Sequence, residues 1–504
     1  MKLSDLLYPE EYTSSADIQD TEISAVVSDT RMLSRGALFV CLRGGRTDSH
    51  TLAAKAEEAG AAAIVADENA LLPEGITVPV LRVKSTRRTL AFLHSRFHGC
   101  PERELTIIGI TGTNGKTSTA TVLYSILRAA GLHAALIGTA ECLYHDKLYT
   151  LPSGGGGERL LTMTTPDPDI LFPMLRTMKE EGITHVVMEV SSHALLLEKV
   201  APIAYAIGIF TNLSPEHLDF HNDMQSYLCA KALLFSQCDV GIFNCDDAYA
   251  EALITRSDCE VVRAGVVWQG DYRATDIELR GTSGVHYSLT APAVRMRIRT
   301  PLPGTFSVYN TLLAATAAIR LGISPITVAD ALCTPIHIPG RLERIPTGAG
   351  CEFSVFIDYA HTEHALRTLL RTVRAFRKKG ERIVLIFGCG GERDRTKRAP
   401  MGRAAEELAD TVIVTSDNPR NEDPRAIIND ILLGMEKPEQ HRVIPSRRRA
   451  IETAIAEAEA GDIILLVGKG HEHYEITASG VHAFDERKIV LAALEKMKKG
   501  DTVE

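Results

Sequence analysis

One short segment constrains the fold of this 504-residue chain more than any other. Residues 105–110 (LTIIGI) have the length and composition of a buried strand. The glycine-containing loop 112–118 (GTNGKTS) follows, and residues 117–130 then have the apolar spacing of a helix that ends before Gly131. A strand that passes through glycines into a helix is typical of α/β folds. We therefore expect an α/β protein with a parallel sheet.

The loop has the chemistry of a phosphate-binding site. Backbone N–H groups in such a loop, together with the N-terminus of the following helix, attract anions. Lys116 stands where an ammonium group can reach the β- and γ-phosphates of a nucleotide, and the Thr117 hydroxyl can hold Mg²⁺. Two residues separate Gly112 from Gly115, whereas the common nucleotide-binding loop has four, which argues against a P-loop GTPase. The alternative is a glycine turn with an incidental lysine.

Composition excludes several classes of protein. Hydrophobic residues make up 45% and charged residues 24%, which is globular rather than disordered or fibrous. The net charge of −9 gives no support for bulk nucleic-acid binding. The ten cysteines form no CxxC pair, which favours reduced thiols over disulfides or zinc. The N-terminus has no signal-peptide pattern, and apolar runs such as 463–468 are too short to span a membrane. We expect a cytoplasmic monomer with no membrane or nucleic-acid partner.

Length and two breaks in the chain predict three domains. The polar segment 98–104 and the segment 335–341 (PIHIPGR) read as boundaries. We expect domains at 1–100, 101–338 and 339–504. After the second break, strand-like and helix-like runs alternate regularly, which predicts a doubly wound domain of Rossmann type.

Chemically dense loops follow the predicted strands of the last domain. They are residues 358–362 (DYAHT), 388–398 (GCGGERDRTKR) and 416–423 (SDNPRNED). Ligand sites of doubly wound folds lie at the carboxyl ends of strands, so these loops are candidate ligand contacts. The four glycines at 154–157 open no helix, and we interpret them as a flexible surface insert rather than a phosphate cradle.

Three further residues in the middle of the chain could carry chemistry. Glu189 ends the strand-like run 185–190 (HVVMEV), where a carboxylate could ligate a metal, and His217 lies in a polar loop. Lys231 lies in an apolar helical stretch. On the residue pattern alone, His217 is an ordinary loop residue and Lys231 a surface lysine whose stem covers apolar neighbours.

The motifs taken together resemble the Mur ligase family, and within it the UDP-N-acetylmuramoyl-tripeptide synthetases, which add the third residue of the peptidoglycan stem peptide. The resemblance runs from about residue 24 to 490, in the family's order. The motifs that carry it are GTNGKTS, MEVSSHAL, TNLSPEHLDFH, AKALLF, PGRLE, DYAHT, GCGGERD and DNPR.

The resemblance implies a three-domain ligase with a P-loop central domain, a Rossmann-like C-terminal domain, ATP as a substrate and Mg²⁺ as a cofactor. ATP phosphorylates a carboxylate, and an amine then attacks the acyl phosphate. This chemistry needs charge neutralisation and in-line placement. The residues implied for ATP are Gly112, Thr113, Asn114, Gly115, Lys116, Thr117, Ser118, Asn310, Arg341 and Asp358.

The metal ligands implied by the resemblance are Thr117 and Glu189 for one Mg²⁺, His217 for a second, and Lys231. Lys231 matches a family position that CO₂ converts to a carbamate, and an anionic oxygen donor suits Mg²⁺ where an ammonium would repel it. Lys116, Lys231 and His217 are the implied catalytic residues.

The N-terminal domain is implied to bind the UDP-muramoyl dipeptide. The matching positions are Thr30, Arg31, His50, Thr164, Thr165, Ser191 and Lys199. Three of these motifs depart from the family pattern: Thr30 replaces a serine, Met163 an asparagine and Lys199 an arginine. Lys199 keeps the charge but loses the two-pronged geometry of a guanidinium.

The incoming amino acid is implied by the motif 417–420 (DNPR). Its Arg420 matches relatives that use meso-2,6-diaminopimelate, which carries one carboxylate more than lysine, and a guanidinium is the natural partner for that group. The implied contacts are Arg393, Asp417, Asn418, Pro419, Arg420, Gly468 and Glu472. We therefore expect a ligase that adds meso-2,6-diaminopimelate to UDP-N-acetylmuramoyl-L-alanyl-D-glutamate. The alternatives are a ligase for L-lysine or another diamino acid, a folylpolyglutamate synthetase, or a nucleotide-binding switch with a degenerate site.

Overall fold

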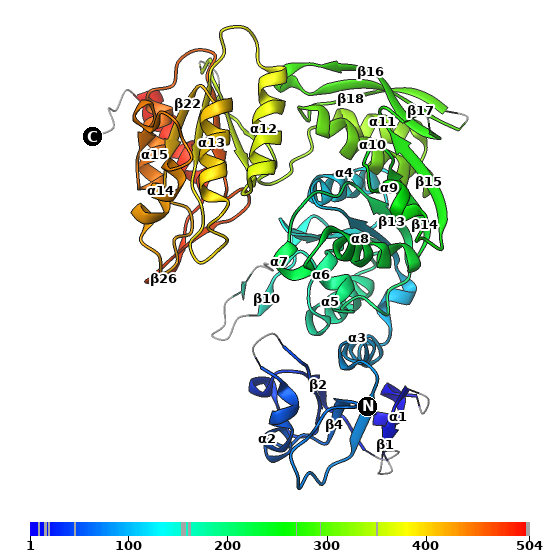
Figure 1. Cartoon of the computed structure of the whole chain (residues 1–504). Coiled ribbons are helices and arrows are strands. Elements are labelled where there is room, and N and C mark those ends of the chain that lie inside the picture. The colour runs from blue at the N-terminus through cyan, green and yellow to red at the C-terminus, as the bar shows by residue number, and fades with distance from the viewer. Residues whose placement is uncertain are drawn as a thin grey trace. The chain divides into compact units, whose positions relative to one another are not determined.

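The computed structural model divides the chain into two compact units. One consists of Met1–Arg273 and Leu312–Val328, the other of Ala274–Thr311 and Ala329–Glu504 (Figure 1). The structure describes all residues except 9–10, 15–17, 19–20, 45–46, 153–157, 160–162, 269, 293, 349–350 and 500–504. The glycines 154–157, predicted to be a surface insert, lie outside the described residues. The predicted boundaries of three domains stay a prediction, and each unit is described by itself.

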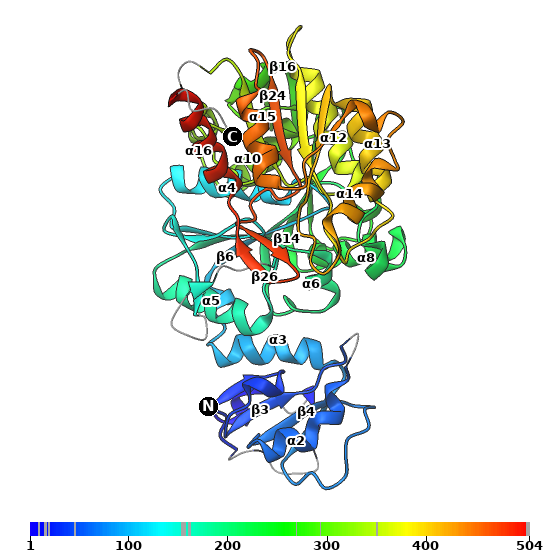
Figure 2. The same ribbon diagram turned by 90° about the vertical axis from the view of Figure 1, so that its left-hand side faces the viewer.

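The first unit begins with a small sheet of order β1-β5-β4-β3-β2. Its strands are β1 (Thr13–Ser14), β2 (Ala25–Val27), β3 (Ala37–Val40), β4 (Ala63–Asp67) and β5 (Val80–Val83). All four residues of β3 are buried, as its continuous apolar sequence requires. Helix α2 (Ala53–Glu58) lies between β3 and β4 in sequence, and α3 (Thr86–Phe97) follows β5 and contacts α5 (Pro168–Glu180) (Figure 2).

The larger sheet of the first unit has the order β15-β14-β13-β6-β12-β7-β8-β9. Its parallel strands are β6 (Thr106–Thr111), β7 (Ala134–Ile137), β12 (His185–Glu189), β13 (Tyr205–Phe210), β14 (Cys238–Asn244) and β15 (Glu260–Gly265), and its edge strands are β8 (Cys142–Tyr144) and β9 (Lys147–Leu148). The apolar runs predicted to be strands are therefore confirmed here, with β6 between β12 and β13.

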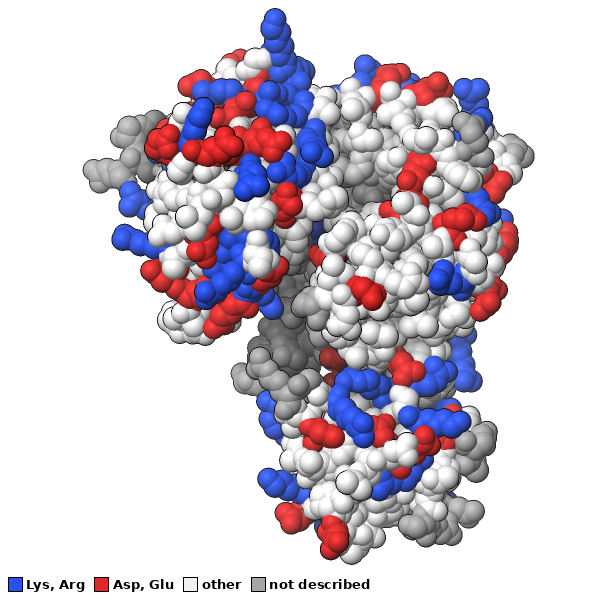
Figure 3. Space-filling view, viewed as in Figure 1, with Lys and Arg blue, Asp and Glu red and all other residues white. Residues whose placement is uncertain are grey.

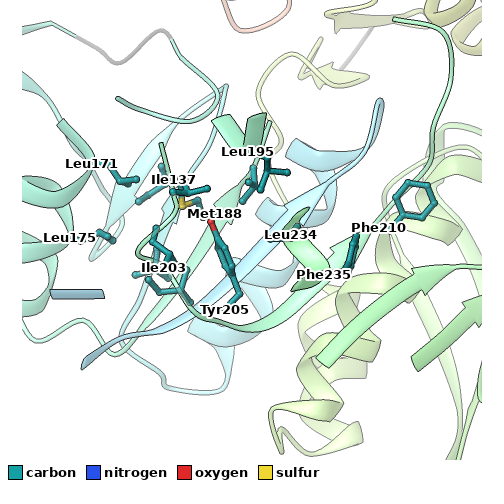
Figure 4. Packing of buried hydrophobic residues seen from close by; sticks show 14 of the residues in the cluster. Ile137, Leu171, Leu175, Met188, Leu195, Ile203, Tyr205, Phe210, Leu234 and Phe235 are labelled. Atoms are coloured by element: carbon teal, nitrogen blue, oxygen red, sulfur yellow. The ribbon is translucent and has the colours of Figure 1, made fainter. Parts of the chain in front are cut away.

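Helices cover this sheet and bury its apolar side chains. They are α4 (Lys116–Ala129), α5, α6 (Ser192–Leu196), α7 (Leu218–His221), α8 (Met224–Ala232) and α9 (Ala250–Ile254). Tyr205, Leu234 and Phe235 pack in the core on one side of the sheet (Figure 4). Gly109 of β6 leaves the room for this packing, because a Cβ there would lie 2.8 Å from the Tyr205 ring and 2.9 Å from a Leu234 methyl group.

The second unit contains the predicted doubly wound sheet, of order β19-β20-β24-β21-β22-β23. Its strands are β19 (Glu343–Ile345), β20 (Ser354–Asp358), β21 (Ile383–Phe387), β22 (Thr411–Val414), β23 (Arg442–Val443) and β24 (Ile463–Val467), all parallel except β19. Its helices are α12 (Glu363–Phe376), α13 (Arg398–Leu408), α14 (Pro424–Leu432), α15 (Arg447–Ala456) and α16 (Glu486–Lys499).

Alternate residues along the strands of this sheet pack into two separate hydrophobic cores. Leu385 and Leu465 pack with α12–α14, whereas Ile386 and Leu466 pack with α15 and α16. Continuous apolar strands buried on both faces are what a parallel sheet between two helix layers demands. The second unit also holds the hairpin of β17 (Val285–Ala291) and β18 (Val294–Thr300) and that of β25 (Tyr474–Thr477) and β26 (Gly480–Ala483).

Three remaining elements lie at or across the boundaries between the units in sequence. They are β16 (Tyr272–Leu279), α10 (Thr305–Arg320) and α11 (Pro325–Cys333).

All ten cysteines are free thiols, as the sequence predicted. Within the described part of the chain, no helix is long and apolar enough to cross a membrane.

Candidate active site

The loop between β6 and α4 adopts the conformation that its glycines were predicted to permit. Gly112 has φ +150° and Gly115 has φ +85°, and α4 then begins at Lys116 and continues through Thr117 and Ser118. A Cβ at Gly112 would lie 1.9 Å from the hydroxyl oxygen of Thr211, so no other residue fits there without moving β13's end. The loop therefore presents the N-terminus of α4, which is an anion-binding element.

The segment after β13 clamps this loop. The Thr113 N–H donates to the Asn212 carbonyl at 2.8 Å, and the Asn114 N–H donates to Asn212 Oδ1 at 3.0 Å. The Thr211 hydroxyl and the Asn212 side-chain amide both donate to the Asn114 carbonyl, at 2.7 and 2.9 Å. Sequence reasoning did not identify Asn212, although its place directly after a buried strand beside β6 is a signal for it.

Two lysines meet at one carbonyl of the loop. Lys116 Nζ donates to the carbonyls of Gly112 and Thr113, both at 2.8 Å, and Lys231 Nζ donates to the same Gly112 carbonyl at 2.9 Å. Lys231 is 1% exposed, so its interpretation as a surface lysine is wrong. Burial, and then the positive charge of Lys116, hold the pKa of Lys231 well below its usual value. Its amine is thereby biased toward the neutral, nucleophilic form.

Glu189 lies at the carboxyl end of β12 and is 1% exposed. Its carboxylate accepts hydrogen bonds from the Thr117 hydroxyl at 3.1 Å, from the Thr139 N–H at 2.8 Å and from the Thr139 hydroxyl at 3.1 Å. A Cβ at Gly138 would lie 2.4 Å from Glu189 Oε1. Sequence reasoning missed Thr139, which follows β7, the parallel neighbour of β12.

The residues around Glu189 fit a magnesium ion. A buried carboxylate and a hydroxyl 3.1 Å apart are hard oxygen donors, and they stand at the N-terminus of the helix that the phosphate loop opens. Among the described residues, no group of three His, Cys, Asp or Glu side chains is arranged to hold a metal. The fit therefore depends on Glu189 together with Thr117.

His217 belongs to an aromatic group rather than to the described partners of Glu189. It has φ +56°, and its ring centroid lies 5.0 Å from that of His193, which stacks on Phe220 at 4.0 Å. His221 is buried beside this group, and its Nε2 lies 2.8 Å from the Ser192 hydroxyl. The role of His217 as a metal ligand stays a prediction.

Four of the residues implied for the muramoyl substrate gather near the end of β12. The Thr165 hydroxyl donates to the Glu189 carbonyl at 3.0 Å and accepts the Ser191 N–H at 3.0 Å. The hydroxyl oxygens of Thr164 and Thr139 lie 2.9 Å apart. Lys199, where the family has arginine, makes an ion pair with Asp167 at 2.6 Å.

The three implied residues of the N-terminal sheet have their own partners there. Thr30 begins a short 3₁₀ turn that Asp29 caps, and Arg31 pairs with Asp29 at 2.6 Å while its side chain is 87% exposed. His50 is buried: its Nδ1 lies 2.6 Å from Asp48, and its Nε2 accepts the Asp67 N–H at 3.1 Å. One ring nitrogen of His50 therefore holds its own loop and the other holds the end of β4, whereas Arg31 is open to a ligand.

In the second unit, the implied nucleotide contacts come from three places in the chain: Asp358 ends β20, Arg341 precedes β19 and Asn310 lies on α10. Asp358 accepts the N–H groups of Leu342 and Ala360, at 2.7 and 2.8 Å. Burial raises the pKa of Asp358, and the Arg341 guanidinium partly offsets this. Arg341 lies over the Tyr359 ring, 4.8 Å from its centroid. Asn310 is buried on α10.

The loops after β22 and β24 meet around Asn418. Asn418 Oδ1 accepts from Lys469 Nζ at 3.0 Å and from the Ile476 N–H at 2.9 Å, and Asn418 Nδ2 donates to Glu472 at 2.7 Å. Asp417 Oδ1 lies 3.6 Å from Lys469. Burial, and then the Asp417 charge, raise the pKa of Glu472. Sequence reasoning did not identify Lys469, which is fully buried.

The two implied arginines flank the glycine loop after β21. Arg420 Nη1 donates to the Gly391 carbonyl at 2.8 Å, and the residue has φ +53°. A Cβ at Gly390 would lie 3.1 Å from Arg420 Nη1 and 3.7 Å from Arg393 Cγ. A Cβ at Gly468 would lie 2.6 Å from Asp417 Oδ2. The structure places one set of implied residues in a single group of loops: Arg393, Asp417, Asn418, Pro419, Arg420, Gly468 and Glu472. Their role in binding the amino acid stays a prediction.

On the face in Figure 3, basic and acidic side chains alternate over α12–α14. Ion pairs on or beside these helices include Arg367 with Glu407 at 2.6 Å and Arg395 with Glu422 at 3.0 Å.

Comparison with known proteins matches three family models to this chain. The Mur ligase family catalytic domain matches residues 22–98, the Mur ligase middle domain matches 110–318, and the Mur ligase glutamate ligase domain matches 340–470.

Two curated relatives carry the same name, UDP-N-acetylmuramoyl-L-alanyl-D-glutamate–2,6-diaminopimelate ligase. The relative from Geobacillus thermodenitrificans is 38% identical over 95% of this chain and 96% of its own length. The relative from Syntrophomonas wolfei is 39% identical over 94% of this chain and 95% of its own length.

Solved structures share the fold. A structure of UDP-N-acetylmuramoyl-L-alanyl-D-glutamate–2,6-diaminopimelate ligase superposes with a TM-score of 0.71 at 28% identity and covers 99% of both chains. A Mycobacterium tuberculosis folylpolyglutamate synthase superposes with a TM-score of 0.60 at 18% identity and covers 82% of this chain and 95% of its own. The second likeness is one of fold alone.

Proposed function

The chain belongs to the Mur ligase family, and from this premise we propose that it joins meso-2,6-diaminopimelate to UDP-N-acetylmuramoyl-L-alanyl-D-glutamate in an ATP-dependent reaction. The names of relatives 38% and 39% identical over nearly the whole chain support this reaction. The observation that carries the choice of amino acid is Arg420, whose guanidinium stands beside Gly391 in the loops around Asn418. The product is a precursor of peptidoglycan, and we infer that the enzyme acts as a monomer in the cytoplasm.

The phosphate loop and its lysine hold ATP in this proposal. Backbone N–H groups of the loop and the N-terminus of α4 bind the phosphates, and Lys116 can leave its carbonyl partners to contact the γ-phosphate. ATP transfers its γ-phosphoryl group to the D-glutamate γ-carboxylate, which makes an acyl phosphate. The amine of diaminopimelate attacks the acyl carbon, and phosphate leaves as the amide forms. Positioning and charge neutralisation supply most of the acceleration.

Thr117 and Glu189 are proposed as the magnesium ligands, with His217 near a second ion. Bound Mg²⁺ would neutralise charge on the triphosphate. Thr139 donates twice to Glu189 and thereby fixes the orientation of the carboxylate.

Lys231 is proposed to react with CO₂. Burial holds the pKa of its amine well below the usual value, which favours the neutral form that reacts with CO₂. The nitrogen attacks the carbon of CO₂ and loses a proton to solvent, and a carbamate results. The product exchanges a cation for an anionic oxygen donor beside the phosphate loop, where it would serve the metal.

Amino-acid specificity tests this function. Phosphate release and product mass are measured with UDP-N-acetylmuramoyl-L-alanyl-D-glutamate, ATP, Mg²⁺ and one candidate amino acid at a time. We expect turnover with meso-2,6-diaminopimelate and little with L-lysine. Turnover with L-lysine alone overturns the choice of amino acid. Turnover of a folyl substrate in place of the muramoyl dipeptide overturns the proposed function as a whole.

A further inference from the structure

Lys469 is a fully buried cation at the centre of the loops that are proposed to bind the amino acid. It follows β24, and its Nζ donates to Asn418 Oδ1 at 3.0 Å and to the Tyr474 carbonyl at 2.9 Å. The same Nζ lies 3.6 Å from Asp417 and 3.9 Å from Glu472.

Burying an ammonium group costs free energy, because the charge loses its hydration. The groups around Lys469 therefore indicate what its buried charge does. Two carboxylates, Asp417 and Glu472, lie within 4 Å of this ammonium group. The Glu472 carboxyl has a raised pKa from burial and from Asp417, and Lys469 opposes that shift. The Lys469 ammonium, 3.6 Å from Asp417 and 3.9 Å from Glu472, offsets the repulsion between these two carboxylates, which together can receive an incoming ammonium group.

Lys469 also decides which way the Asn418 amide faces. Asn418 Oδ1 accepts from Lys469 and from the Ile476 N–H, so the amide NH₂ has to face Glu472, to which it donates at 2.7 Å. If Lys469 were absent, rotating the Asn418 amide by 180° would break one hydrogen bond fewer than it does in the unmodified protein, so the amide orientation would be less firmly fixed.

We propose that Lys469 is a positioning residue for amino-acid recognition: it touches no substrate, and it sets the charge and orientation of Asn418, Asp417 and Glu472. The proposal deepens the proposed function, because it concerns how the same loops recognise a diamino acid.

The variant Lys469→Met tests this by steady-state kinetics, since methionine keeps the apolar stem and removes the charge. Loss of one buried charge-assisted hydrogen bond predicts a rise in KM for the amino acid of about 10- to 100-fold. The KM values for ATP and for the muramoyl dipeptide should stay within about two-fold. Equal rises in all three KM values, or none, would overturn the proposal.

A matched control separates positioning from loss of stability. Arg382 pairs with Asp462, which is 3% exposed and precedes the same strand β24 at its opposite end. The variant Arg382→Met also leaves a buried carboxylate without its cation, so it should lower thermal stability as Lys469→Met does. It should leave the KM for the amino acid unchanged. A similar KM rise in this control would show that the effect of Lys469 is general destabilisation, and would overturn the proposal.

A double-mutant cycle tests whether Lys469 acts through Glu472. In the background of Glu472→Gln, adding Lys469→Met should raise KM for the amino acid much less than it does in the unmodified enzyme. Strictly multiplicative effects would overturn the coupling. The cycle uses whichever amino acid the unmodified enzyme turns over, so a wrong choice of diaminopimelate and a wrong role for Lys469 give different results.

Discussion

At the scale of single residues, backbone conformation and hydrogen bonds fix the position of the Arg420 guanidinium. Its φ of +53° is uncommon for a residue with a side chain, and its N–H is fixed by the Ile476 carbonyl at 3.0 Å. The guanidinium is anchored on the Gly391 carbonyl through Nη1. We expect Arg420→Ala to raise KM for meso-2,6-diaminopimelate by about 10- to 100-fold, because a charge-assisted contact to a carboxylate is lost. Kinetics with each substrate varied in turn measures this.

Arg395→Ala is the control for that substitution. Arg395 lies in the neighbouring loop, pairs with Glu422 at 3.0 Å and is 69% exposed. An exposed pair contributes little, so its loss should leave KM for the amino acid unchanged. An Arg420→Ala enzyme with an unaltered KM would contradict the assignment.

Lys231 gives a second prediction at this scale. Because burial and the Lys116 charge lower the pKa of Lys231 and so favour its neutral amine, ¹³C-bicarbonate should label it, and a carbamate signal should appear in ¹³C NMR. Lys231→Ala should lose at least about 100-fold in turnover, since an anionic ligand is removed from a charge-dense site. Acetate should restore part of that turnover by occupying the vacated space. An alanine variant as active as the parent would exclude the carbamate.

The local motifs were predictable from the sequence, whereas their partners were not. GTNGKTS determines its own loop, because positive φ at Gly112 and Gly115 is a property of those residues. The residue pattern alone placed Lys231 on the surface. An apolar helical stretch fits a surface lysine whose stem covers apolar neighbours as well as it fits a fully buried lysine. Only tertiary packing brings its Nζ to Gly112. Lys469 was missed for the same reason, since its partner Asn418 lies 51 residues away in the sequence.

At the scale of elements, the ends of β7 and β12 depend on a glycine. These strands are parallel neighbours, and Gly138 follows β7 directly beside the Glu189 carboxylate. We expect Gly138→Ala to push that carboxylate away from Thr117, because the new methyl group would lie 2.4 Å from Oε1. The Mg²⁺ concentration for half-maximal turnover should rise by about 10-fold or more, as it does when an outer contact of a metal ligand is lost.

Gly131→Ala provides the comparison for Gly138→Ala. Gly131 has φ +78°, and a Cβ there would meet nothing within 4 Å. This variant should lose some stability and keep its Mg²⁺ requirement. If both variants kept the parent's requirement, Glu189 would not be a metal ligand.

Elements with strong periodicity were predicted well, and those without it were missed. The parallel strands are apolar runs buried on both faces, so composition alone reveals them. All four residues of β26 are exposed, so this strand carries no hydrophobic signal. The β17–β18 hairpin pairs residues 285–300 antiparallel within a chain whose other signals were those of parallel units.

At the scale of the whole molecule, sequence breaks and packing divide the chain differently. The sequence predicts a boundary between 338 and 339, at a proline- and glycine-containing segment. In the structure, residues 274–311 belong to the same compact unit as the C-terminal sheet. A break in composition reports where the chain turns, whereas the extent of a unit depends on which apolar faces it buries.

Phe306 allows this difference to be tested. It packs against the core cluster that includes Leu366, Leu369 and Leu370 of α12, and a Cβ at the nearby Gly304 would lie 2.5 Å from Thr372 of the same helix. We expect Phe306→Ala to destabilise the second unit by about 1–3 kcal/mol, because a partly buried aromatic ring is removed. The amides of α12 should then exchange with deuterium faster, as site-resolved mass spectrometry measures. Leu433→Ala, at a side chain 81% exposed in the same unit, should leave that exchange unchanged. If α12 were equally protected in the Phe306→Ala chain, residues 274–311 would not share a folding unit with the C-terminal sheet.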